Sequence, residues 1–169
     1  MRCPVCDSET VCQTGKHRYV ESGLDNVFIS GIEICKCPCG EEIVNVPAVP
    51  ELHSLIGLFL VKKKALLTGK EIRFLRKNMG LTGKKLSDYI GVDNATISRW
   101  EKGSQAINKP NDRLLRLLYC NIKGIPQEEV KQSVVEEFHD IMPEQRDMPD
   151  HIIALEQWLK SDNACLSLR

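Results

Sequence analysis

Residues 81–103 read LTGKKLSDYIGVDNATISRWEKG, and this stretch decides the fold of the chain. Thr82 stands where its hydroxyl can cap a short helix. Gly91 stands where that helix must end in a sharp turn, because glycine adopts positive φ at little cost. The apolar side chains that this first helix is expected to turn inward are Leu86, Tyr89 and Ile90.

A second helix is predicted directly after the turn, with Asp93 as its N-cap. Ile97 and Trp100 lie three residues apart and are expected to face inward. The side chains left outward are Asn94, Ala95, Thr96, Ser98 and Arg99. Two helices joined by a short Gly-containing turn form a helix-turn-helix, whose second helix lies in the major groove of DNA. A helical hairpin of another all-α domain is the alternative.

The same residues resemble the lambda-repressor-like (XRE-type) family. The resemblance rests on the small Ser87 after Leu86, on Ile90-Gly91, and on ISRWEKG at 97–103. It implies that the first, second and sixth residues of the second helix read bases. The residues expected at the DNA are Thr82, Lys84, Lys85, Asn94, Ala95, Thr96, Ser98, Arg99 and Lys102.

Arg99 can donate two hydrogen bonds to guanine, and Asn94 can pair with adenine in the same bidentate way. A salt bridge along its own helix is the alternative for Arg99. The lysines are expected to bind phosphates, together with the cations of a preceding helix at 68–78. A short recognition helix gains affinity on a palindrome when the protein binds as a homodimer. Double-stranded operator DNA is thus the first expected partner.

Two more helices of this domain carry expectations about their faces. In helix 68–78, Ile72 and Leu75 are expected inside, with Arg73, Arg76 and Lys77 outside. In helix 109–121, the predicted core face is Leu114, Leu117 and Leu118, and the predicted outer face holds Arg113 and Arg116.

Charge is unevenly distributed, although the whole chain has a formal net charge of zero. Residues 1–61 hold four Lys/Arg against eight Asp/Glu, a net −4. Residues 62–124 hold fifteen against five, a net +10, and residues 125–169 hold four against ten, a net −6. A basic block that coincides with the helix-turn-helix favours a DNA-facing module.

Eight cysteines are many for an intracellular chain, where clustered thiols indicate metal rather than disulfides. Cys3-Pro-Val-Cys6 can supply two thiolates to one zinc ion. A second cluster holds Cys35, Cys37 and Cys39 for two remaining positions. Gly40 suits the turn after such a ligand pair. The intervening residues predict two or three antiparallel strands around one structural Zn²⁺, which would supply roughly 10–16 kcal/mol of folding free energy.

CPVC at the start, Gly31-Ile32, a Cys six positions after Gly31 and then Cys-Gly-Glu-Glu together resemble the YgiT/MqsA-type zinc finger. The resemblance implies Cys3, Cys6, Cys37 and Cys39 as ligands. The chain departs from the family's second CxxC because Cys37-Pro-Cys39 is one residue shorter, which leaves Cys35 open as a substitute ligand. A thioredoxin-like role for CPVC has no supporting βαβ pattern.

The order of these segments predicts an α+β fold: a small zinc-bound antiparallel β domain followed by an all-α lambda-repressor-like domain. The expected boundaries are a finger at 1–48, a linker helix within 49–66, a helix-turn-helix domain at 67–124 and an acidic helical extension at 125–169. Helix 51–65 is apolar on two sides, and helices are predicted at 127–138 and 150–160. Surplus apolar surface in the linker helix or the tail would serve dimerisation.

The MqsA-type resemblance implies an antitoxin of a type II toxin–antitoxin system that binds a toxin through its finger and its own operator through its helices. A stand-alone regulator whose finger senses metal or redox state is the alternative, motivated by the spare Cys35 and Cys12. No nucleophile–base pair or Gly-rich phosphate loop indicates an enzyme. No long apolar run or signal peptide is present, so a cytoplasmic protein without membrane contact is expected.

Overall fold

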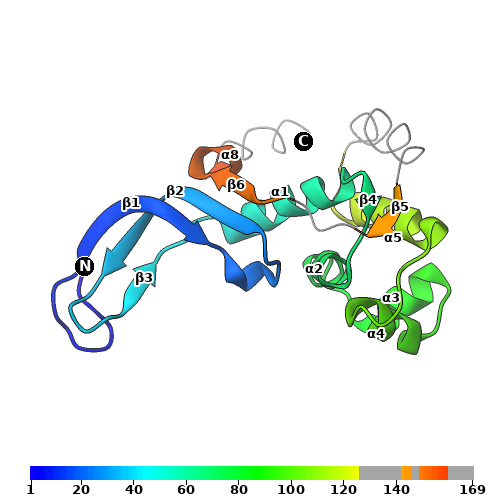
Figure 1. Ribbon diagram of the computed structural model, residues 1–169, viewed down its shortest axis with the longest axis horizontal. Helices are drawn as coiled ribbons and strands as arrows, with labels where there is room; N and C mark the ends of the chain where they lie inside the picture. The colour runs from blue at the N-terminus through cyan, green and yellow to red at the C-terminus, as the bar shows by residue number, and fades with distance from the viewer. Residues whose placement is uncertain (126–141, 146–148, 160–169) are drawn as a thin grey trace. The chain divides into compact units, whose positions relative to one another are not determined.

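The structure is a computed structural model that describes residues 1–125, 142–145 and 149–159 (Figure 1). The chain divides into two compact units. The first, here called the sheet unit, comprises residues 1–52 together with the segment that follows residue 148. The second, the helical unit, comprises residues 53–148. The predicted α+β fold, an antiparallel β domain followed by helices, is confirmed.

Three antiparallel strands form the body of the sheet unit, in the order β1-β2-β3. Their bounds are β1 Val11–Arg18, β2 Val27–Lys36 and β3 Glu42–Val44, with a 3-10 turn at Val20–Ser22 between the first two. The turn ends at Gly23, whose φ of 74° lies in the left-handed region. The meander brings the N-terminal loop and the β2–β3 loop to one end of the sheet.

Strand β2 carries a bulge at Gly31. Gly15 of β1 faces Ile32 and Lys16 faces Ser30, so Gly31 is the extra residue. Its φ of 82° lies in the left-handed region that glycine adopts at little cost. The bulge shifts the alternation of the strand, so that the buried positions are Val27 and Ile29 before it and Ile32 and Ile34 after it.

The segment after residue 148 adds a fourth strand to this sheet. β6, His151–Ala154, pairs in parallel with the first half of β2, and the short helix α8, Leu155–Leu159, follows it. The amphipathic helix predicted at 150–160 is therefore wrong over its first half. Residues 151–154 alternate, with Ile153 buried and Ile152 exposed, which suits a strand on an open sheet edge. The predicted helix 127–138 lies outside the described residues.

Trp158 anchors this returning segment. Its side chain is fully buried, and its indole N–H donates to the carbonyl oxygen of Pro47 at 3.0 Å. A buried indole that also satisfies its N–H gains both apolar burial and a hydrogen bond. The end of the described chain is thereby part of the core of the sheet unit.

Between the strands and the helix-turn-helix lies α1, Val49–Val61, which ends four residues before the predicted end at Ala65. The chain then runs through β4, Ala65–Leu66, which pairs in parallel with β5, Met142–Gln145. No helix within the described residues is long and apolar enough to cross a membrane.

Four helices form the body of the helical unit: α2 Gly69–Asn78, α3 Gly83–Ile90, α4 Asn94–Glu101 and α5 Lys109–Ile122. Their shared core is Ile72, Leu75, Leu86, Ile97, Trp100, Leu115 and Tyr119. At Gly69 the start of α2 approaches the end of α4 so closely that an added Cβ would lie 2.4 Å from the carbonyl oxygen of Trp100. Only glycine fits there without moving backbone.

Helix α5 buries a different face from the predicted one. Leu114 and Leu117 are 40% and 42% exposed, whereas Arg116 is fully buried. Arg116 donates to the carbonyl oxygens of Val61, Lys63 and Ala65 and pairs with Asp112, its neighbour one helical turn earlier.

The same Asp112 accepts a hydrogen bond from the backbone N–H of Leu67 at 2.9 Å. The segment 61–67 therefore needs buried donors and an acceptor, and this need turns the polar face of α5 inward.

Replacing Arg116 with Met tests this arrangement. The change leaves the Asp112 carboxylate buried without its cation and three carbonyl oxygens without a donor. We expect the free energy of unfolding to fall by roughly 3–5 kcal/mol. Urea unfolding followed by far-ultraviolet circular dichroism measures it. The exposed Lys109→Ala on the same helix should change stability by no more than about 0.5 kcal/mol. An Arg116→Met variant as stable as the parent would contradict the structural role.

Candidate metal centre and nucleic-acid interface

Two tight turns present the four cysteines that were predicted as ligands. In the first, the N–H of Asp7 donates to the carbonyl of Cys3 at 2.9 Å. In the second, the N–H of Gly40 donates to the carbonyl of Cys37 at 3.0 Å. Both turns need a positive φ, which Gly40 supplies at 94° and Asp7 at 58°. The role predicted for Gly40 is thus observed, and Asp7 does the same in the first turn.

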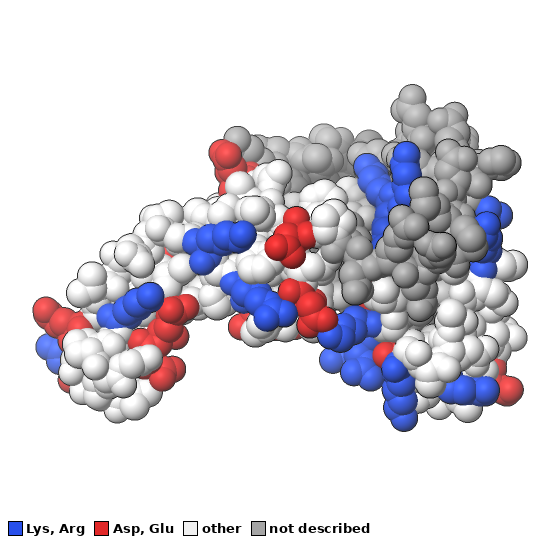
Figure 2. Space-filling view, viewed as in Figure 1, with Lys and Arg blue, Asp and Glu red and all other residues white. Residues whose placement is uncertain are grey.

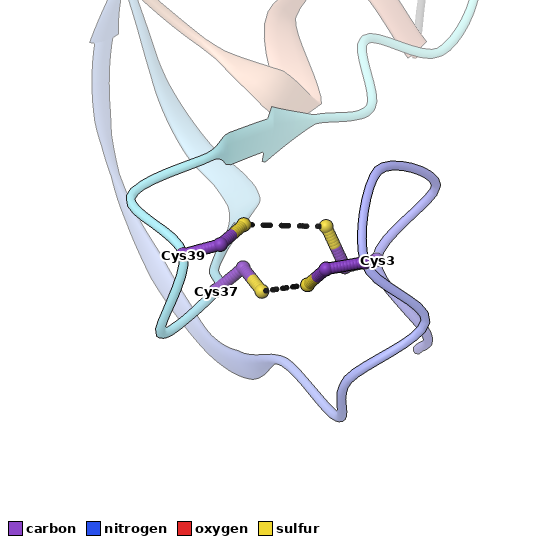
Figure 3. A group of neighbouring side chains, drawn as sticks. Cys3, Cys37 and Cys39 are labelled. Carbon is purple, nitrogen blue, oxygen red and sulfur yellow. Dashed lines mark hydrogen bonds between the residues drawn. The ribbon is translucent and has the colours of Figure 1, made fainter.

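The four sulfur atoms converge, and all lie within 4.8 Å of one another. The Sγ atoms of Cys3 and Cys39 are 3.7 Å apart, and those of Cys6 and Cys37 are 3.4 Å apart (Figure 3). Four thiolates around a tetrahedral Zn²⁺ with bonds of about 2.3 Å would be about 3.8 Å apart. The cluster could therefore hold one such ion, and the shortened Cys37-Pro-Cys39 spacing still brings both sulfurs to it.

Cys35 does not substitute for Cys37. It forms a disulfide with Cys12, which lies directly opposite on β1, with a Cα–Cα distance of 4.0 Å. Cys35 is therefore not available as a substitute ligand for Cys37. The expectation that clustered thiols indicate metal rather than disulfides is wrong for Cys35. The cause is the β1–β2 register, which places the two cysteines face to face at a cross-strand position.

The thiols of the cluster differ in acidity. Hydrogen bonds from the side chain and backbone of Ser8 lower the pKa of Cys6 to about 6. The backbone hydrogen bond at Cys39 lowers the pKa of Cys37, but burial and the neighbouring thiols outweigh it and raise that pKa to about 12. A cation bound at the cluster would have to displace the proton from Cys37, because the thiolate is the metal ligand.

In the helical unit, the predicted helix-turn-helix is observed between α3 and α4. Thr82 caps α3 by accepting from the N–H of Lys85 at 3.2 Å, and Gly91 ends it with a φ of 78°. Asp93 has the extended N-cap conformation, but its side chain makes no capping hydrogen bond. Tyr89 is 61% exposed and not part of the core, contrary to the prediction.

The outer face of α4 carries the predicted base-reading residues. Asn94, Ala95 and Arg99 are exposed, and Thr96 and Ser98 are half-buried. The guanidinium of Arg99 lies back on its own helix, donating to the carbonyl of Ala95 and to the hydroxyl of Thr96, both at 3.3 Å. The predicted alternative of a salt bridge along the helix is not observed for Arg99 among the described residues. Its two hydrogen bonds are long and made to neutral acceptors, so a DNA base can replace them.

The cations of the basic block fall into two groups. Lys85, Lys102 and Lys109 are exposed, and Lys84 is exposed but pairs with Asp88 at 2.8 Å. Figure 2 shows Lys and Arg side chains predominating over Asp and Glu on the visible face of the helical unit.

Other cations of the block bind carboxylates of the protein. The guanidinium of Arg76 bonds both carboxylate oxygens of Glu101, so its predicted place on the outer face of α2 is wrong. Lys63 is buried against Glu71 at 2.7 Å and is therefore not available to phosphate.

Sequence reasoning missed three residues that place this interface. Gly69 allows the close approach of α2 to α4, and Glu101 ties α4 to α2 through Arg76. The third residue is Gly83. An added Cβ there would lie 2.9 Å from the amide oxygen of Asn94, so the start of α3 limits where Asn94 can point. A glycine within the first two positions of a predicted helix was the available signal at Gly69 and Gly83.

Comparison with known proteins agrees with this geometry. Residues 72–118 match a family model described as Helix-turn-helix, from inside α2 to inside α5. The helical unit therefore contains an XRE-type, lambda-repressor-like helix-turn-helix domain, which supports a DNA-binding regulator. No curated protein matches the chain. The match does not reach the cysteine cluster.

The pKa values of the cluster thiols predict how zinc affinity depends on pH. Because burial and neighbouring thiols hold the pKa of Cys37 at about 12, Zn²⁺ must release that proton in order to bind at neutral pH. We expect zinc affinity to fall steadily as the pH is lowered from 8, and to fall more steeply below the pKa of Cys6, about 6, because zinc must then displace the proton of Cys6 as well. Competition with a chromophoric chelator measures this. An affinity independent of pH would show that thiolates are not the ligands.

Proposed function

We propose that the chain is a zinc-stabilised autorepressor and antitoxin: it binds operator DNA through α3 and α4 and a toxin protein through the sheet unit. The observation that carries the proposal is a helix-turn-helix with an exposed reading face in the same chain as a four-cysteine finger. Residues 1–61 carry a net −4 and would complement a basic protein partner. The proposed role is binding rather than catalysis.

Zinc at Cys3, Cys6, Cys37 and Cys39 would serve structure. The ion would tie the N-terminal loop, which carries Cys3 and Cys6, to the β2–β3 loop, which carries Cys37 and Cys39. A domain with so small a core depends on such a link for its stability. The sheet unit would then present a fixed surface to the partner.

Sequence choice in the operator is assigned to Arg99 and Asn94. Arg99 can exchange its two long hydrogen bonds for a bidentate pair with guanine, worth about 1–3 kcal/mol of discrimination. Asn94 can pair with adenine. Lys85 and Lys102 would bind phosphates, which sets affinity and salt dependence but not sequence.

The operator is proposed to be palindromic and bound by a homodimer. The exposed Leu114 and Leu117, on the solvent face of α5, replace the linker helix and the tail as the proposed contact. Leucines one turn apart on an open helix face are what a two-fold helix pair buries.

Operator binding by Arg99→Ala tests the reading role. We expect the variant to lose affinity for the cognate operator by about 1–3 kcal/mol and to lose its preference over operators changed at one base pair. Lys102→Ala is the matched control, because it should weaken binding equally on all sequences and reduce the salt dependence. Fluorescence anisotropy on a variant operator set measures both.

Equal loss by Arg99→Ala on every sequence would place Arg99 on phosphate. The same assay with DNA cut to one half-site tests the dimer. A full palindrome should bind much more tightly and with a steeper concentration dependence than the half-site, whereas equal binding would contradict the dimer.

The toxin partner is tested in its own experiment. A small protein encoded beside this chain should copurify with it and arrest growth when expressed without it. Rescue should survive Arg99→Ala and be lost in Cys6→Ser, because the proposed toxin contact needs the finger and not the DNA face. If no neighbouring product binds or is neutralised, the antitoxin role fails while operator repression stands.

The stand-alone regulator remains the second candidate, favoured by the Cys12–Cys35 disulfide beside the four-cysteine cluster. It requires operator affinity to differ among zinc-loaded, chelated and reduced protein. Equal affinity in the three states would count against it.

A further inference from the structure

The six cysteines of the sheet unit that lie within the described residues form two separate groups. Cys3, Cys6, Cys37 and Cys39 make the cluster described above, and Cys12 and Cys35 make a disulfide across β1 and β2. Neither the four-thiol site nor the DNA face uses the second pair. A protein that binds DNA works among reducing thiols, where disulfides are usually transient and redox-sensing.

The ladder between β1 and β2, rather than the disulfide, holds the second pair in place. Val11 pairs with Lys36 on one side of Cys12–Cys35, and Gln13 pairs with Ile34 on the other. In the bonded pair the Cα atoms are 4.0 Å apart, and because the strand register does not depend on the bond, the two thiols should still face each other after reduction. Side-chain rotation suffices to separate the sulfurs to the spacing of two ligands on one metal.

Glu33 completes a potential ligand set. It lies two residues before Cys35 on β2 and therefore on the same face of the strand. One carboxylate oxygen of Glu33 and the sulfurs of Cys12 and Cys35 lie within 4.8 Å of one another. Glu33 is exposed and is in none of the ion pairs of the described chain, so its carboxylate is available.

We propose that Cys12, Glu33 and Cys35 form a second metal site, closed by the disulfide and opened by its reduction. Two thiolates and one carboxylate suit Zn²⁺, with water as a fourth ligand. Cys12 is exposed, whereas Cys35 is only 2% exposed. A reductant therefore reaches the bond from the Cys12 side. The sheet unit then holds one ion when oxidised and two when reduced.

A low-molecular-weight thiol of the cell can reduce the Cys12–Cys35 disulfide in two exchange steps. One thiolate attacks the sulfur of Cys12, and Cys35 leaves as a thiolate. A second thiolate attacks the external sulfur of the mixed disulfide, which releases Cys12 and an oxidised low-molecular-weight disulfide. The two electrons come from the external thiols. Zn²⁺ then binds the two protein sulfurs in place of their protons.

Zinc stoichiometry of the full chain in two redox states tests the site. The oxidised protein and protein reduced by a phosphine, which does not itself supply thiol ligands, are loaded with Zn²⁺ under argon, desalted and assayed by mass spectrometry of the metal. We expect one equivalent in the oxidised chain and two in the reduced chain. A mild chelator should remove the second equivalent first, because its site has an open position.

Variants assign each equivalent. Cys12→Ser should hold one equivalent in both states, and Glu33→Gln, which leaves the disulfide intact, should weaken only the second. Cys6→Ser should remove the first, which separates failure of this proposal from failure of the finger. Cys120→Ser is the matched control, since its buried thiol lies in the helical unit, and it should keep both.

Two results would overturn the proposal. One is a reduced chain that binds no more zinc than the oxidised chain. The other is a second equivalent that survives both Cys12→Ser and Glu33→Gln. Cys165→Ser shows whether a tail thiol supplies such an equivalent. Cobalt substitution adds a check: the second ion should have weaker sulfur-to-cobalt charge transfer than the first.

Discussion

The buried ion pair of Asp112 and Arg116 is the constraint on which the helix-turn-helix depends. Both side chains are fully buried, and burying charge is costly unless every polar atom finds a partner. Here the partners are backbone groups of the segment that leads into α2. That segment has no long strand or helix to satisfy its own carbonyls. The ion pair therefore fixes the path of the chain just before α2 begins.

Contacts between α2 and α4 then hold α4, the helix predicted to read bases, in place. The start of α2 touches the end of α4 at Gly69, where only a residue without a side chain fits. Glu101 of α4 binds Arg76 of α2, and Glu71 of α2 binds both the N–H of Thr68 and the ammonium of Lys63. These pairs join cations and acids of the same block, residues 62–124, so its net +10 lies on the remaining cations. Three of its cations, Lys63, Arg76 and Arg116, hold helices together and leave the phosphates to the exposed lysines.

The distance along the chain between interacting residues explains which of these features the sequence could predict. The helix-turn-helix was predictable because its signals are local: caps, Gly91 and the spacing of Ile97 and Trp100. The four-thiol cluster was predictable because two short Cys motifs carry it. The inward face of α5 was not, because the leucine pattern of 114–118 suggests an apolar face, whereas the carbonyls of a distant segment turn Arg116 inward. Strand β6 pairs with a partner more than 120 residues away, which periodicity cannot indicate.

The Cys12–Cys35 pair depends on one residue that the sequence pattern did not reveal. Alternation from Val27 and Ile29 would continue inward through Gly31, Glu33 and Cys35, and would bury a carboxylate. The bulge at Gly31 reverses this phase, so Ile32 and Ile34 enter the core and Glu33 is exposed. The same shift sets Cys35 opposite Cys12 and, two residues on, directs Cys37 into the four-thiol cluster. A single glycine at φ 82° thereby decides which residues in the second half of β2 enter the core and which face outward.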